Sequence, residues 1–175
     1  MTSDRTLISR APVAITVAGT RILLPYRPAA DWAVVIESVS ALAGTLAEPA
    51  DRERLADLLM EHPDAATDMR AESLRILAEQ SGWKWWEAGR LIATSLGREI
   101  LGRLTLAGLD PHQRSLGEWC AATYALCTKG QDEKGRIRFD FHLSLPPPGY
   151  HDEWDDEGDD PAAIMQAVQA MTGKR

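Results

Sequence analysis

The chain has 175 residues, a formal net charge of −7 and 45% hydrophobic residues. A chain of this length can bury a core without disulfides or metal ions. The acidic balance disfavours nucleic acid and anionic membrane surfaces as partners, because both attract Lys and Arg. We expect neither a nucleic-acid partner nor a membrane partner.

The start of the chain predicts a flexible arm followed by a small β-hairpin. Residues 1–11 are polar and lack the apolar core of a signal peptide, so we expect an arm of an intracellular protein. Apolar residues alternate with smaller ones over 13–17, which is the period of a strand. Residues 18–20 supply the turn, in which Gly19 can take a positive φ, and residues 21–24 form the return strand before Pro25. A lone hairpin is marginal in water, so we expect it to pack on helices.

Apolar residues then recur at helical spacing and predict three helices. The first begins at Trp32 and ends at Gly44. The second stops before Pro63, because the residue that precedes a proline avoids the helical conformation. The third is capped by Asp64 and ends at Gly82.

The middle of the chain is its most hydrophobic part. Trp83, Trp85 and Trp86 open a predicted helix that continues to Leu104. Three glycines interrupt it, each costing about 1 kcal/mol relative to alanine in a helix. These are Gly89, Gly97 and Gly102. They either allow close helix packing or mark a break.

A capping box, Ser115 and Glu118, predicts the start of the next helix. Its apolar side holds Leu116, Trp119, Cys120, Thr123 and Cys127. On one helix the two cysteines are about 10.5 Å apart, which is too far for a disulfide. We expect buried, reduced thiols in a reducing compartment.

Residues 136–145 admit two interpretations. Ile137, Phe139, Phe141, Leu143 and Leu145 alternate strictly with polar residues. This pattern is typical of an edge strand with one wet face. A helix would use only Ile137, Phe141 and Leu145 on one face. The prolines at 146–148 end the element in either case, and we expect the helical domain to span residues 12–149.

Residues 150–175 predict a disordered acidic linker and a weak terminal helix. Positions 152–175 hold seven acidic and two basic residues, a net charge of −5. Glu153, Asp155 and Glu157 resemble the start of a calcium loop. Ile164 stands where that loop needs a bidentate glutamate, so a solvated linker is favoured.

No pattern of catalytic, metal-binding or cofactor-binding residues is present in the sequence. The four histidines have no partner at zinc-ligand spacing, and neither a phosphate-binding loop nor a nucleophile elbow occurs. We therefore expect neither an enzyme nor a metal or cofactor site.

Tryptophans are the candidate partner-binding residues, because they often anchor protein interfaces. The candidates are Trp83, Trp85, Trp86, Trp119 and Trp154. Core packing is the alternative, since three tryptophans within four residues cannot all face one way on a helix.

Four segments together resemble the tail assembly chaperones of actinobacterial siphophages. They are LLPYRPAADW (23–32), GWKWWEAGRLI (82–92), LGREILGRLTLAGLDPHQRSLGEWCAATYAL (96–126) and RFDFHLSLPPPG (138–149). The matching pieces span about residues 13–149 and are hydrophobic patterns with characteristic Trp, Gly and Pro positions. The resemblance implies a mainly α protein, with residues 136–145 helical.

The resemblance also implies a function. Such a protein binds the tape measure protein during tail assembly in the host cytoplasm and is absent from the mature virion. The family is commonly made in a second form by a programmed −1 ribosomal frameshift, for which Gly173 and Lys174 mark the expected position. That longer form would be a further partner, and a homo-oligomer stays open. The rival interpretations are a structural tail or head-completion protein and an acidic host-directed binding protein.

Overall fold

A computed structural model describes residues 12–33, 45–148 and 150 of the chain. The chain divides into two compact units, Met1–Leu145 and Pro146–Arg175, and the first is described below. The predicted arm, most of the helix between Trp32 and Gly44, and the acidic tail lie outside the described residues.

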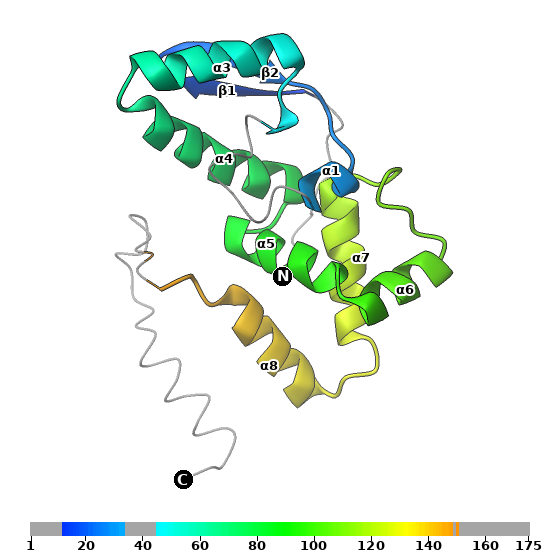
Figure 1. The fold of residues 1–175 in the computed structure, drawn as a ribbon. Coiled ribbons are helices and arrows are strands. Elements are labelled where there is room, and N and C mark those ends of the chain that lie inside the picture. The colour runs from blue at the N-terminus through cyan, green and yellow to red at the C-terminus, as the bar shows by residue number, and fades with distance from the viewer. Residues whose placement is uncertain (1–11, 34–44, 149, 151–175) are drawn as a thin grey trace. The chain divides into compact units, whose positions relative to one another are not determined.

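The first unit is a mainly helical domain with an N-terminal antiparallel β-hairpin, which confirms the predicted fold class (Figure 1). Its elements are β1 (Val13–Val17), β2 (Thr20–Leu24), α1 (Ala29–Ala33), α3 (Pro49–Glu61), α4 (Ala65–Ser81), α5 (Trp85–Ser95), α6 (Arg98–Leu106), α7 (Leu116–Thr128) and α8 (Glu133–Ser144). None of the helices in the described ranges has the length and apolarity that crossing a bilayer requires.

The hairpin turn lies where the sequence predicts it, but it uses two residues, because Thr20 already pairs with Val17. Ala18 and Gly19 both have positive φ, 47° and 72°, which is the backbone of a type I′ turn. The strands pair in register, with Ile15 opposite Ile22. Alternate residues of both strands are fully buried, so one face of the hairpin belongs to the core.

Helix α4 covers the outer edge of β1 with charged side chains. The bonds run from the amide of Thr16 to Glu72 (3.2 Å), from the amide of Ala18 to Asp68 (2.9 Å) and from Arg75 to the carbonyl of Ala14 (2.6 Å). An unpaired strand edge invites pairing with other chains, so these bonds protect it. The hairpin is therefore packed on a helix, as expected.

The helix predicted from Trp83 to Leu104 starts later than expected. It begins at Trp85, and it breaks at Gly97 into α5 and α6. Gly97 has an extended ψ of 131°, and a Cβ there would lie 3.1 Å from the carbonyl oxygen of Thr94. The glycine thus marks a break, which was one of the two predicted roles.

The predicted helix ends are mostly confirmed. Gly82 ends α4 in the left-handed conformation at φ 70°. Ser115 and Glu118 form the capping box of α7, each side chain accepting from the other residue's amide. Asp64 precedes α4 as predicted, but its side chain makes no capping hydrogen bond because its own backbone is already helical.

Residues 133–144 form helix α8, so the strand interpretation of the alternating pattern is wrong and the helical one is confirmed. Asp132 caps the helix by accepting a 2.7 Å hydrogen bond from the amide of Gly135. Leu143 is buried in the main core, and Phe139 packs against it. Capping and packing on one side favour a helix despite the period-two pattern.

The core has two clusters. The larger joins the hairpin to α4, α5, α7 and α8, and the smaller comprises Ala29, Leu104 and Trp119. Cys120 is fully buried on α7, while Cys127 is only half-buried, so the predicted burial of both thiols holds for the first alone. Burial raises the pKa of the Cys120 thiol to about 12.

Candidate partner-binding groove

The structure separates the predicted tryptophans into different environments. Trp86 and Trp119 lie in the core, 6% and 3% exposed, whereas Trp83 and Trp85 are half-buried. Trp154 lies outside the described residues. Trp83 alone among the described candidates lines a groove, so the structure does not gather the five residues into one site.

The groove has a volume of about 400 Å³ and lies among the start of α5, the middle of α7 and the second half of α8. Its lining residues are Trp83, Glu87, Tyr124, Asp140, Phe141, Leu143 and Ser144. They come from positions up to 61 residues apart in the sequence, so the packing of α8 beside α5 and α7 creates the groove.

Aromatic rings form the wall of the groove. The ring of Trp83 lies 5.2 Å from that of Tyr124, tilted by 44°. The ring of Tyr124 lies 5.8 Å from that of Phe139, tilted by 54°. Tilted aromatic pairs contribute about 0.5–1.5 kcal/mol beyond the area that they bury. Trp83 and Tyr124 line the groove, and Phe139 packs on the main core. The wall therefore offers a preformed apolar surface.

Two carboxylates accompany the aromatic wall, and both are positioned by hydrogen bonds. Asp140 accepts a 2.7 Å bond from the hydroxyl of Tyr124. Glu87 accepts a 3.2 Å bond from the amide of Lys84, where it completes the capping box of α5. The groove thus combines apolar rings with fixed negative charge.

A cluster of hydrogen bonds joins the end of α8, which lines the groove, to α5. The guanidinium of Arg90 donates to the carbonyl oxygens of His142 and Leu143, both at 2.8 Å, and to that of Leu145. The indole of Trp86 donates to the carbonyl of Ser144 at 3.0 Å. The C-terminal end of a helix dipole is negative, so the positive charge of Arg90 also stabilises this end of α8 electrostatically.

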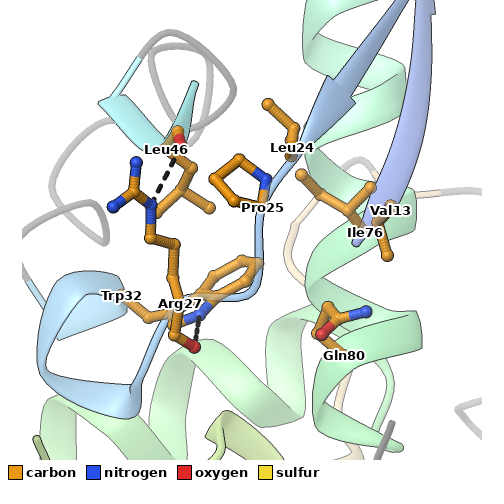
Figure 2. A pocket seen from close by; sticks show the side chains of 8 residues that line it. All are labelled: Val13, Leu24, Pro25, Arg27, Trp32, Leu46, Ile76 and Gln80. Carbon is orange, nitrogen blue, oxygen red and sulfur yellow. Dashed lines mark hydrogen bonds between the residues drawn. The ribbon is translucent and has the colours of Figure 1, made fainter. Parts of the chain in front are cut away.

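A second pocket lies where the hairpin meets α1 and α4 (Figure 2). Its volume is about 10 Å³, the space of a single water molecule. Arg27 crosses it, donating to the carbonyl of Leu46 at 3.1 Å, and Trp32 donates to the carbonyl of Arg27 at 3.3 Å. This pocket is a packing feature, too small for a ligand.

Sequence reasoning missed several residues of the groove. Tyr124 and Glu87 were not singled out, although Tyr124 lies one turn beyond the buried Cys120 on the same helix. Arg90 also went unnoticed, because its partners lie more than fifty residues away. In the sequence, Phe141 is one residue of the alternating pattern over 136–145, which does not indicate a groove.

No three His, Cys, Asp or Glu side chains of the described residues gather where they could hold a metal ion. Comparisons with protein-family models, curated proteins and solved structures gave no match to this chain.

Proposed function

We propose that the protein is a binding protein whose groove takes an apolar helical segment of a client. The observation that carries this proposal is that an aromatic wall, Trp83 and Tyr124, faces a second wall from α8 in one groove. Helix-in-groove recognition uses an apolar surface of this kind, read by side chains spaced one turn apart on the client.

The negative charge of the groove restricts which client segments it can bind. Glu87 and Asp140 lie beside the aromatic rings, and like charges across an interface are unfavourable. A client segment that combines apolar residues with Lys or Arg on one flank suits this lining. An acidic client segment does not.

The resemblance of the sequence to siphophage tail assembly chaperones supplies the identity of this client. We propose that the client is the tape measure protein, and that the chain keeps it soluble in the host cytoplasm until the tail is assembled. The net charge of −7 supports solubility of the complex through repulsion between copies. A frameshift-extended form would share this client.

The direct experiment is co-expression with the tape measure protein encoded by the same phage. We expect the client to become soluble and to copurify with the chain. Trp83→Ser and Asp140→Lys should each reduce the soluble client, the first by removing apolar wall and the second by reversing the charge. Leu106→Ser is the matched control, because Leu106 is 90% exposed and lines neither pocket.

Two results would count against this function. One is a tape measure protein that is equally soluble without the chain. The other is recovery of the chain from purified mature particles, which indicates a structural virion protein. Circular dichroism of both groove variants separates loss of binding from loss of fold.

A further inference from the structure

Helix α8 has apolar stripes on two opposite sides. Residues two apart on a helix are separated by about 160° around its axis, so strict alternation distributes apolar residues to both sides. Phe139 and Leu143 pack on the core. Ile137 and Phe141 lie on the other side. Ile137 is 49% exposed, and Phe141 is half-buried at the groove. We call Ile137 and Phe141 the outer stripe.

Charged residues flank the outer stripe with opposite signs on its two sides. Glu133 and Asp140 lie along one flank and Arg138 along the other, and all three are exposed. In heptad terms Ile137 and Phe141 take positions d and a, the acidic residues take g and Arg138 takes e. No ion pair among the described residues engages Glu133 or Arg138.

We propose that the outer stripe pairs in parallel with the outer stripe of a second copy of this chain. In a parallel pair, a residue at g faces the e residue of the other helix five positions further along. Glu133 precedes Arg138 by that interval. Because the pair has twofold symmetry, it contains two equivalent ion pairs, each between Glu133 of one copy and Arg138 of the other.

The charge pattern also selects the parallel direction. An antiparallel pair brings g positions together, which would place the carboxylates of Glu133 and Asp140 against those of the second copy. Phe139 and Leu143 pack on the core, so the half-exposed Ile137 lies on the side of α8 that a second copy can reach.

The pairing should be weak, because the helix is short and its stripe holds few apolar residues. The helix has 12 residues, fewer than two heptads. Lys134 takes an a position, where a charged residue fixes the register at a cost in stability. The dimer is therefore in concentration-dependent exchange with the monomer. Because Phe141 and Asp140 also line the groove, pairing and client binding use overlapping parts of α8.

The test is analytical ultracentrifugation of the full chain at concentrations up to about 1 mM, where even a millimolar dissociation constant is visible. We expect the wild-type chain to dimerise. Glu133→Arg alone and Arg138→Glu alone should each weaken the dimer about tenfold or more, since both equivalent ion pairs become repulsive. Both substitutions are on exposed residues, and circular dichroism checks that α8 is kept.

The mixture of the two variants tests whether charge complementarity between Glu133 and Arg138 supports the pairing. In a parallel pair, a chain carrying Glu133→Arg meets a chain carrying Arg138→Glu with opposite charges at both contacts, so the mixture should dimerise at least as well as the wild type. A monomeric wild type at the highest concentration, single variants that dimerise normally, or a mixture no better than its components would each overturn the proposal. Neither Glu133 nor Arg138 lines the groove, so client solubilisation by these variants reports separately on the proposed function.

Discussion

Trp119 on α7 donates a 2.9 Å hydrogen bond from its indole Nε1 to the hydroxyl oxygen of Ser95, the last residue of α5. Both residues are buried, and the Ser95 hydroxyl in turn donates to the carbonyl of Ile92 at 2.7 Å. The two polar side chains therefore satisfy each other inside the core and fix α7 against α5.

Ser95→Ala should destabilise the fold by about 2 kcal/mol, because it leaves the indole N–H of Trp119 buried without an acceptor. Trp119→Phe should also destabilise. The double variant should lose about 1 kcal/mol less than the sum of the single losses, since the two residues form one interaction. Urea unfolding of the four proteins measures this coupling, and strict additivity would contradict it.

Arg90→Ala should destabilise the fold by about 2 kcal/mol, because three carbonyl groups at the end of α8 lose a charged donor. Hydrogen exchange should increase mainly in α8. Arg103→Ala is the matched control. Within the part of the chain that the structure describes, the Arg103 side chain pairs only with the exposed Glu99 of its own helix, and its loss should cost less than about 0.5 kcal/mol. Equal effects of the two substitutions would mean that Arg90 does not hold α8.

Local signals account for what the sequence predicts correctly. The type I′ turn at Gly19, the helix end at Gly82 and the capping box at Ser115 each depend on residues within a few positions of one another. Such interactions survive in any tertiary context, so the pattern of the sequence is sufficient to find them.

The groove depends on long-range packing and could not be found in the same way. Tyr124 and Asp140 are 16 residues apart, and Arg90 reaches carbonyl groups more than fifty residues away. The alternating residues of α8 show the same limit. Period two is typical of a strand, whereas in α8 it places Phe139 and Leu143 on the core and leaves Ile137 49% exposed.

Two glycine-to-alanine substitutions should change the stability of the fold in opposite directions. Gly82→Ala should destabilise by about 1 kcal/mol, because Gly82 has φ +70°, which a Cβ disfavours. Gly89→Ala should stabilise by up to about 1 kcal/mol, because Gly89 lies inside α5 with no heavy atom within 4 Å of an added Cβ. Thermal melting of both variants checks the pair. A destabilised Gly89→Ala would show that the position serves another contact.

The buried thiol of Cys120 should make stability sensitive to alkaline pH. Burial raises its pKa from 9.0 to about 12, so between these values the unfolded chain releases a proton that the folded chain keeps. The contribution of the protonated Cys120 thiol to the free energy of unfolding is complete below pH 9 and falls as pH rises, by up to about 1.4 kcal/mol per pH unit.

Urea unfolding of the wild type and Cys120→Ala at pH 8 and pH 10 measures the effect. Cys127 and the other titrating groups are common to both proteins, so the difference between their unfolding free energies isolates Cys120. We expect the advantage of the wild type over Cys120→Ala to shrink by about 1 kcal/mol across this range, and an unchanged difference would mean that the Cys120 thiol ionises in the folded protein at its ordinary pKa.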